Sequence, residues 1–384
     1  MRALIAFDKF KDALSAEAAC EVAARVLRHT HPDWELDLCP LTDGGESFGE
    51  ILTKAAHGRL DCHAVTGPMG ATVRAPIGFV DAAKLPPPVR SRLALAPAER
   101  IAVIGMASAS GLELVPPDRR NPWRTTTRGT GELIGHARDA GASVIVLGVG
   151  GSATNDLGLG ALAALGWLFD REPLPENWPH LRRIGGGACL PRIIIACDVV
   201  NPLLGAHGAT ATFGPQKGLK PADVPCLDAE MARVAALLCA AAGQPFTATE
   251  TPGAGAAGGI ACGLMVAAGA TLTPGFELVS DWLGLADRIA AADLVITGEG
   301  RFDATSLAGK GPGSLVREAR RQGKTAHVFA GSLGITADGF HHAITPAGLP
   351  LPEALARCPE LLAEAVARTC GLCDSRLAAA ERTP

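Results

Sequence analysis

Short apolar runs alternate with amphipathic stretches along most of the chain. Residues 144–147 read Val-Ile-Val-Leu, and such a wholly apolar run with β-branched side chains predicts a strand buried on both faces. Residues 4–7, 192–196, 293–297 and 327–330 predict further strands, and apolar positions at helical spacing follow most of them. This alternation predicts an α/β fold with parallel strands.

The strand at residues 144–147 leads into a glycine-rich turn, Gly148-Val-Gly-Gly-Ser-Ala-Thr-Asn-Asp156, and then into an apolar helix expected at about residues 157–168. Such a turn places backbone N–H groups and a helix N-terminus at the carboxyl edge of a sheet, where they can bind phosphate. We therefore expect nucleotide contacts from these residues: Gly150, Gly151, Ser152, Thr154 and Asn155. A purely structural turn and a weak dinucleotide-binding pattern, G-x-G-x-x-A, are the alternatives.

Charged residues follow other predicted strands. Asp8 and Lys11 follow the first strand, Asp198 follows a later one, and Asp43 and Glu46 flank a double glycine. Carboxylates at the ends of parallel strands can hold Mg²⁺ or orient a substrate hydroxyl. Capped helix starts and solvated loops are the alternatives at these positions.

Phosphoryl transfer needs this mixture of groups. Carboxylates hold Mg²⁺, cations and backbone N–H groups neutralise phosphate oxygens, and one carboxylate can take the proton of the attacking hydroxyl. Further charged candidates for nucleotide binding lie close to these loops: Lys217, Glu299, Arg301 and Lys310. The sequence contains neither a G-x-x-x-x-G-K-[ST] motif nor a protein-kinase H-R-D motif, which excludes those two classes of phosphotransferase.

Composition narrows the class of protein. With 384 residues, 48% of them hydrophobic, the chain is long enough for two or three domains with sizeable cores. The formal net charge of −4 gives no basis for binding nucleic acid or an anionic membrane. The N-terminal segment predicts a strand rather than a signal peptide, and the eleven scattered cysteines indicate a reducing compartment. We therefore expect a cytoplasmic protein that acts on small molecules.

Motifs over nearly the whole chain occur in the order found in one family. The most specific are the following: Asp43-Gly-Gly-Glu46, Gly150-Gly-Ser-Ala-Thr-Asn-Asp156, Ala196-Cys-Asp198, Asn201-Pro-Leu-Leu-Gly205, Phe213-Gly-Pro-Gln-Lys-Gly218, Gly253-Ala-Gly-Ala-Ala-Gly-Gly259 and Asp293-Leu-Val-Ile-Thr-Gly-Glu-Gly-Arg301. Together they make the chain resemble the glycerate kinases of the bacterial two-domain type.

The resemblance implies ATP- and Mg²⁺-dependent phosphorylation of D-glycerate to 2-phosphoglycerate by a monomer or homodimer. It also implies two α/β domains with the active site in the cleft between them. We expect a Rossmann-like or flavodoxin-like domain made of residues 1–68 and 288–384, and an inserted α/β domain at residues 69–287.

Site roles are assigned on the same positions. The expected catalytic residues are Asp198, Asp43, Lys11 and Asp8, and the expected metal ligands are Asp43, Glu46 and Asp156. We place Asp198 nearest the chemistry, as a base or a Mg²⁺ ligand, because a rigid apolar strand delivers it. A helix-capping or turn aspartate is its structural alternative.

The sequence departs from the family pattern near the expected site. Lys9, Gly105 and Val200 stand where the family usually has Ser, Glu and Asp, and Thr305-Ser306 replaces Gln-Thr. Because the first three departures change charge, they bear on substrate choice. A kinase for a related small hydroxy acid and a non-catalytic nucleotide- or dinucleotide-binding protein are the alternative functions.

Overall fold

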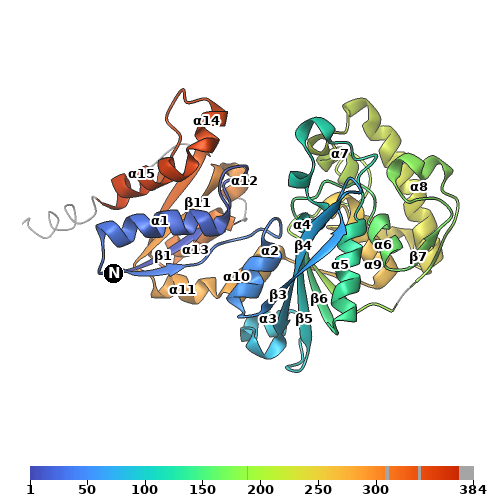
Figure 1. Cartoon of the computed structure of the whole chain (residues 1–384), viewed down its shortest axis with the longest axis horizontal. Helices are drawn as coiled ribbons and strands as arrows, with labels where there is room; N and C mark the ends of the chain where they lie inside the picture. The colour runs from blue at the N-terminus through green and yellow to red at the C-terminus, as the bar shows by residue number, and fades with distance from the viewer. Residues whose placement is uncertain (188, 308–310, 336–338, 372–384) are drawn as a thin grey trace, which may run out of the picture. The chain divides into compact units, whose positions relative to one another are not determined.

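The computed structural model describes residues 1–187, 189–307, 311–335 and 339–371. The chain forms two compact units (Figure 1). Unit 1 consists of residues 1–43 and the chain from Val279 onward, and unit 2 consists of Gly44–Leu278. Both units combine a sheet containing parallel strands with helices, so the predicted α/β class is confirmed.

Unit 1 is built on a five-stranded parallel sheet. Its strands, in spatial order, are β13 (His341–Ala343), β12 (Thr325–Leu333), β11 (Leu294–Phe302), β1 (Arg2–Phe7) and β2 (Glu35–Leu38). Helices α1 (Ala16–Thr30) and α15 (Cys358–Cys370) share one hydrophobic core with β1 and β11. Helices α11 (Leu285–Ala291) and α13 (Gly311–Arg321) pack against each other and against the sheet. The sheet therefore carries all its carboxyl ends at one edge.

Unit 2 is built on a six-stranded mixed sheet. Its strands, in spatial order, are β10 (Thr271–Thr273), β9 (Arg192–Ala196), β6 (Val144–Gly148), β5 (Arg100–Gly105), β4 (Thr72–Asp81) and β3 (Arg59–Thr66). The four strands from β10 to β5 are parallel, and β3 and β4 form an antiparallel hairpin at one edge.

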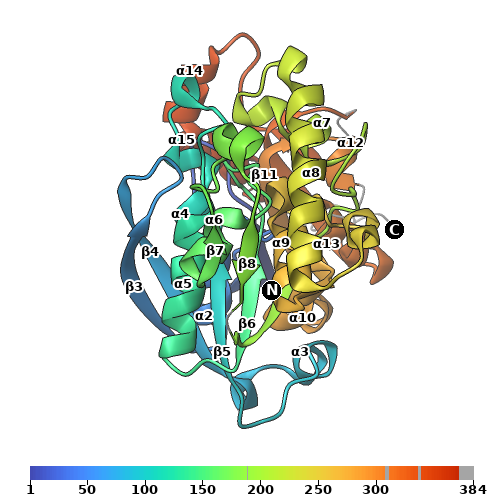
Figure 2. The same cartoon turned by 90° about the vertical axis from the view of Figure 1, so that its right-hand side faces the viewer.

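Helices cover both faces of the unit 2 sheet. Figure 2 faces this unit, and on the near side of the sheet it shows α5 (Arg128–Asp139), α6 (Leu159–Ala164), α8 (Val224–Ala242) and α9 (Ile260–Ala268). These helices enclose the main core with alternate strand residues such as Ile145 and Leu147. Helix α2 (Phe48–Ala55) packs on β4 and β5. Because β6 is buried along its whole length, its prediction as a strand covered on both faces is confirmed.

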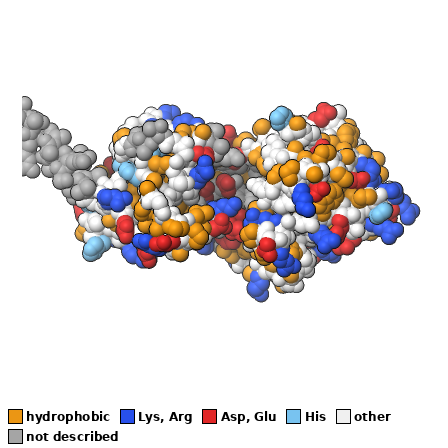
Figure 3. All heavy atoms as spheres, turned by 90° about the horizontal axis from the view of Figure 1, so that it is seen from above, with side chains coloured by type: hydrophobic (Ala, Val, Ile, Leu, Met, Phe, Trp, Pro, Cys, Tyr) orange, Lys and Arg blue, Asp and Glu red, His pale blue; other side chains and the backbone are white. Residues whose placement is uncertain are grey.

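Shorter elements complete the chain. They are α3 (Pro87–Arg92), α4 (Ala107–Ser110), β7 (Trp167–Phe169), β8 (Ile184–Gly186), α7 (Ala209–Phe213), α10 (Gly275–Leu283), α12 (Ala304–Leu307) and α14 (Leu351–Ala356). Within the described ranges, no helix is long and apolar enough to cross a bilayer. Figure 3 shows acidic and basic side chains interspersed on the face that it draws.

Two boundaries differ from the expected ones. The expected domain edge at residue 68 falls in the turn between β3 and β4, and the chain passes between the units after residue 43 and again after residue 278. The expected helix at about residues 157–168 is shorter, since α6 begins at Leu159 and ends at Ala164. Leu157 and Gly158 have φ of 57° and 73°, a left-handed conformation that an α-helix does not accommodate.

Two pairs of glycines explain why residues from Gly44 onward belong to unit 2. The Gly150 N–H donates to the Gly44 carbonyl at 2.9 Å, and a Cβ on Gly150 would lie 2.7 Å from the Gly45 nitrogen. A Cβ on Gly148 would lie 2.6 Å from the Phe48 ring and 2.7 Å from the Gly44 oxygen. The two turns thus pack backbone against backbone, which only glycine permits.

We expect Gly148→Ala to destabilise the protein by about 1–3 kcal/mol, because the added methyl meets a buried backbone oxygen and ring that have no room to move. The matched control is Gly135→Ala in α5, where an added Cβ meets no atom within 4 Å. The control should be neutral or stabilising by up to about 1 kcal/mol, through helix propensity. Denaturant unfolding of the three proteins tests this, and equal midpoints for Gly148→Ala and the parent would contradict it.

Candidate active site

The parallel strands of unit 2 end at one edge of the sheet. Gly148 of β6 pairs with Gly105 of β5 and Ala196 of β9, and Ala196 pairs with Thr273 of β10. The glycine-rich turn after β6 and Asp198 after β9 therefore leave neighbouring strands at the same edge. This is the position at which open α/β sheets bind ligands.

The apex of the glycine-rich turn is formed by the half-buried Gly150 and the exposed Gly151. Gly151 has φ of 69°, and a Cβ there would lie 2.4 Å from Glu46 Oε1. The structure thus brings Glu46, an expected metal ligand, against the expected phosphate-binding turn. The positive φ makes Gly151 unfavourable for any residue with a side chain, whereas the Glu46 carboxylate is the end of a flexible side chain that can shift.

Asp156 holds the turn together from inside. Its Oδ2 accepts hydrogen bonds from Thr127 N and Oγ1, both at 2.8 Å, and from Gly160 N at 3.3 Å, while Oδ1 accepts from Gly158 N at 3.2 Å. The carboxyl group is fully buried, and burial raises its pKa while the Thr127 bonds oppose that rise. These contacts favour a structural role for Asp156 over the expected role as a metal ligand.

Thr154 and Asn155 are also buried. The Asn155 side-chain amide donates to Thr210 Oγ1 at 3.0 Å, and Leu157 N donates to the Gly258 carbonyl at 3.0 Å. Thr154 Oγ1 and Asn155 Oδ1 have no hydrogen-bond partner among the described residues, and nucleotide binding by these two side chains stays a prediction.

Thr127 and Thr210 support the turn, and sequence reasoning assigned neither to the site. The hydroxyl-rich run Thr125-Thr-Thr127 was a usable signal for Thr127. Thr210 lies in α7, where no sequence pattern points to the turn.

Lys217 lies beneath the turn and is only 1% exposed. Its Nζ donates to Ser152 Oγ at 2.9 Å and to the Thr154 carbonyl at 2.6 Å. Burial lowers the pKa of Lys217 to about 7, and the nearby carboxyl of Asp156 acts in the opposite direction. Sequence reasoning placed Lys217 at the nucleotide, whereas these contacts place its ammonium group inside the protein.

Asp198 caps a helix. Phe276 N, in the first turn of α10, donates to both carboxylate oxygens of Asp198, at 3.1 and 3.0 Å. This is the structural alternative that the sequence left open, and carboxylates are favourable at helix N-termini. The Asp198 side chain is half-buried, and its catalytic role stays a prediction.

Unit 1 gathers carboxyl groups at the carboxyl edge of its own sheet. Burial, and next the charge of Asp43, raise the pKa of Asp8 to about 8, with a smaller contribution from Glu299. Burial raises the pKa of Glu299 to about 7. A hydrogen bond from Ser306 lowers this pKa, and repulsion from Asp43 and Asp303 raises it. Glu299 Oε1 is buried and accepts no hydrogen bond from the described residues. Neutral or cation-bound carboxyl groups are favoured here.

The expected cationic residues of unit 1 that the structure describes, Lys11 and Arg301, are exposed to solvent. Lys11 is exposed, and its backbone lies beside Gly300, where an added Cβ would be 3.1 Å from Lys11 N. Arg301 is exposed and its Nε donates to Asp303 at 3.1 Å. Lys310 lies outside the described residues.

The donor set of unit 1 suits Mg²⁺ chemically. In the described ranges, no three His, Cys, Asp or Glu side chains converge as a ready metal site. Mg²⁺ commonly uses only one or two carboxylates and completes its shell with water and phosphate oxygens. Asp8, Asp43 and Glu299 are oxygen donors whose mutual repulsion a divalent cation would relieve.

Comparison with known proteins decides the family. The model of the glycerate kinase family matches residues 3–374 of the chain. The chain belongs to the glycerate kinase family. It is similar to a glycerate kinase of Bacillus subtilis (strain 168), with 38% identity over 94% of this chain and 95% of the relative.

Two further glycerate kinases are similar to this chain. The glycerate 2-kinase of Escherichia coli (strain K12) is 39% identical over 87% of this chain and 86% of its own. A crystal structure of a protein assigned as glycerate kinase 2 from Salmonella typhimurium LT2 matches with a TM-score of 0.75 and 37% identity, covering 100% of both chains. The expected family is therefore confirmed, and with it the mixed α/β architecture.

We expect Asp156→Asn to lower stability by about 2–4 kcal/mol in a buffer free of divalent cations, because the new amide presents donors to backbone donors in a buried site. Asp139→Asn, at the exposed end of α5, is the matched control and should have little effect. Thermal unfolding in EDTA measures both. An unchanged melting temperature combined with a higher Mg²⁺ requirement for turnover would instead make Asp156 a metal ligand.

The raised pKa of Asp8 predicts a pH-dependent stability difference. The folded protein retains a proton on Asp8 up to about pH 8, whereas the ordinary pKa is 3.8, so the stability that this group contributes is lost as pH rises through that window. Since asparagine does not ionise, Asp8→Asn should become progressively more stable relative to the parent as pH approaches 8.

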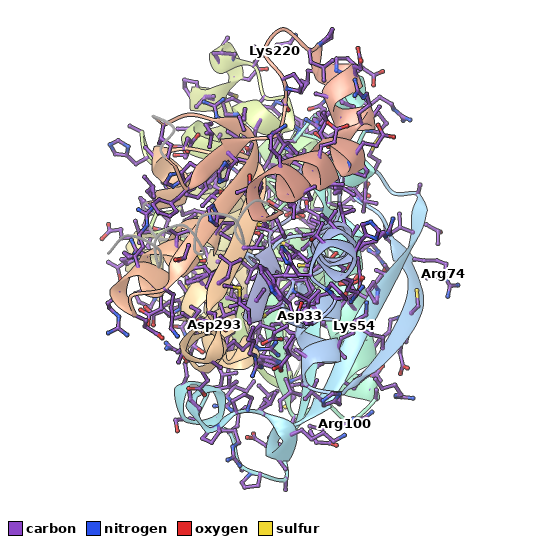
Figure 4. All side chains as sticks on the ribbon, turned by 90° about the vertical axis from the view of Figure 1, so that its left-hand side faces the viewer. Asp33, Lys54, Arg74, Arg100, Lys220 and Asp293 are labelled. Carbon is purple, nitrogen blue, oxygen red and sulfur yellow. The ribbon has the colours of Figure 1, made fainter. Side chains whose placement is uncertain are left out.

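Thermal unfolding in EDTA between about pH 5 and pH 8.5 measures this difference. Asp33→Asn is the control, because Asp33 is an exposed residue of the same unit, labelled in Figure 4. Parallel pH profiles for Asp8→Asn and the parent would show that Asp8 is ordinarily ionised.

Proposed function

We propose that this protein transfers the γ-phosphoryl group of ATP to a hydroxyl of D-glycerate and forms 2-phosphoglycerate. The observation that carries the proposal is the match over nearly the whole chain to proteins named glycerate kinase or glycerate 2-kinase. A match of this extent includes every loop at the two sheet edges, not only the scaffold.

The turn after β6 is the proposed phosphate site. Its apex, Gly150 and Gly151, lets an anion approach the backbone, and Ser152 adds a hydroxyl directly below. The buried bonds of Asp156 and Asn155 hold the turn before any ligand arrives. Preorganised donors of this kind favour the charge that builds on phosphoryl oxygens during transfer.

The carboxyl groups of unit 1 are the proposed metal site. Asp43 raises the pKa of both Asp8 and Glu299, so a cation held by Asp43 and one of them would relieve that repulsion. Mg²⁺ bound there would neutralise charge on the phosphate oxygens. In unit 2, Glu46 is a further candidate ligand because its carboxylate lies beside Gly151.

The base that accepts the glycerate proton is assigned by position. Asp198 follows a buried strand and keeps a fixed orientation through its bond from Phe276 N. A carboxylate fixed in this way can orient a hydroxyl and accept its proton late in a loose transition state. Asp43 and Asp8 are the other proposed catalytic carboxyl groups, with Lys11 and Arg301 as cations that neutralise phosphate.

The setting in the cell is also a proposal. The described cysteines are all free, and six of them are buried. Free thiols are typical of a reducing compartment, so we propose a cytoplasmic enzyme. A monomer or a homodimer is the proposed assembly.

The substrate is tested with ATP, Mg²⁺ and a panel of small hydroxy acids, with ADP release measured by a coupled assay. We expect turnover with D-glycerate and far less with lactate or glycolate, and phosphorus NMR should identify 2-phosphoglycerate as the product. Turnover of another hydroxy acid without turnover of D-glycerate would make that acid the substrate and contradict the proposed one. Binding of NAD(P) in preference to ATP would replace the kinase proposal.

We expect Asp198→Asn to lower kcat by roughly 10²-fold or more, the scale for losing a positioned acid–base group. Asparagine keeps the size and an acceptor for Phe276 N, so the capping bond survives and a structural loss is limited. The control is Asp228→Asn. Asp228 lies in α8, and its side chain likewise accepts a hydrogen bond from a backbone group, Gly205 N, at 3.0 Å. Near-normal turnover of Asp198→Asn at saturating substrates would leave Asp198 a helix cap and pass the catalytic role to Asp43 or Asp8.

A further inference from the structure

Ser152 is the first buried residue below the exposed apex of the turn. Its side chain is enclosed, with the residue only 7% exposed, yet it directly follows the exposed Gly151. The Ser152 hydroxyl oxygen accepts a hydrogen bond from Lys217 Nζ at 2.9 Å. The hydroxyl thus lies between a buried cation on one side and the backbone apex on the other.

The lysine determines what the hydroxyl can do. An ammonium group has three donors and no acceptor, so the bond to Lys217 occupies a lone pair of Ser152 Oγ. The proton of Ser152 must then be donated to a different group, and within the described residues the Ser152 hydroxyl donates no hydrogen bond. A hydroxyl fixed in this way is a donor that awaits an anionic acceptor.

Lys217 is held where it cannot move outward easily. Its ammonium group also donates to the Thr154 carbonyl at 2.6 Å, and the buried Asp156 carboxyl is the titratable group facing it from the turn. On its other side, Gly218 has φ of 90°, and an added Cβ there would lie 2.2 Å from the Arg120 carbonyl. The segment that carries Lys217 is therefore packed backbone against backbone with residue 120.

We propose that Lys217 is a positioning residue that acts through Ser152: it orients the Ser152 hydroxyl so that the proton is donated to a phosphate oxygen of the nucleotide, and it makes no contact with the nucleotide itself. The proposal rests on the proposed function only in that the turn binds phosphate. It replaces the direct lysine–phosphate contact that the sequence suggests with an indirect one.

A double-mutant cycle on ADP binding separates the two arrangements. ADP affinity is measured by calorimetry at about pH 6, where Lys217 carries its proton, for the parent, Ser152→Ala, Lys217→Met and the double variant. Ser152→Ala should weaken ADP binding about tenfold, the size of one charge-assisted hydrogen bond. Lys217→Met alone should weaken binding by about threefold to tenfold, and it should cause less than about a twofold further loss in the Ser152→Ala background.

Equal losses on Lys217→Met in both backgrounds would mean that the lysine contacts phosphate directly, and this would overturn the proposal. Unchanged ADP affinity of Ser152→Ala would overturn it as well. Lys220→Met is the matched control, because Lys220 is an exposed lysine three residues away, labelled in Figure 4, and its loss measures any long-range effect of charge. The control should bind ADP like the parent.

A second lysine variant guards against a folding defect. If Lys217→Met melts well below the parent, the same cycle is run with Lys217→Gln, which keeps a donor for the Thr154 carbonyl without the charge. Ser152→Thr retains the hydroxyl and should bind ADP within about threefold of the parent. If the role of Ser152 is purely structural, the ADP affinity of Ser152→Thr should instead fall to that of Ser152→Ala.

Steady-state kinetics give an independent readout. Ser152→Ala and Lys217→Met should both raise the KM for ATP more than they lower kcat, since they remove a ground-state phosphate contact. If the losses of ADP affinity in the cycle are non-additive but glycerate is not phosphorylated, the inference about Lys217 stands and the proposed substrate is wrong. Turnover of glycerate with an additive cycle would keep the proposed function and reject the inference.

Discussion

The backbone contact between two double-glycine turns underlies the arrangement of unit 2. Gly44 and Gly45 lie against Gly148 and Gly150 so closely that an added Cβ on Gly150 would approach the Gly45 nitrogen to 2.7 Å. This contact ends strand β6, presents the exposed apex of the turn and brings the Glu46 carboxylate against it. It also ties the chain after Asp43 to unit 2, which sets the crossing between the units.

The carboxyl edges of the two sheets differ in the charged groups that they present. In unit 2, the Asp156 carboxylate of the turn is satisfied internally, since it accepts bonds from Thr127, Gly158 and Gly160. In unit 1, the carboxyl groups of Asp8 and Glu299 are buried near Asp43 and have raised pKa values. One edge is a rigid set of donors, which suits an anion, and the other is a set of repelling carboxyl groups, which suits a cation.

Several expected site residues make structural contacts in this fold, and their predicted roles at the ligand stay predictions. Asp156 organises the turn, Asp198 caps α10, and Lys217 bonds to Ser152 and to the backbone. Motif matches pick out such residues as strongly as they pick out ligands, because both depend on particular polar groups at particular positions. The contacts of the folded chain add what the motifs lack: Asp156 and Lys217 have almost no exposed surface and bond to other parts of the protein.

The sequence by itself determined the class of fold, the strands and the loops that carry polar groups, because burial on both faces of a strand leaves an apolar run, and tight turns need glycine at particular positions. Residues 144–147 and the glycines of the turn are examples of both. Only the tertiary structure decided where the units divide, that α6 begins at Leu159 rather than at about residue 157, and which polar side chains are buried. Those outcomes depend on contacts between residues far apart in the chain, such as Lys217 with Ser152 and Gly150 with Gly44, and local patterns carry no record of them.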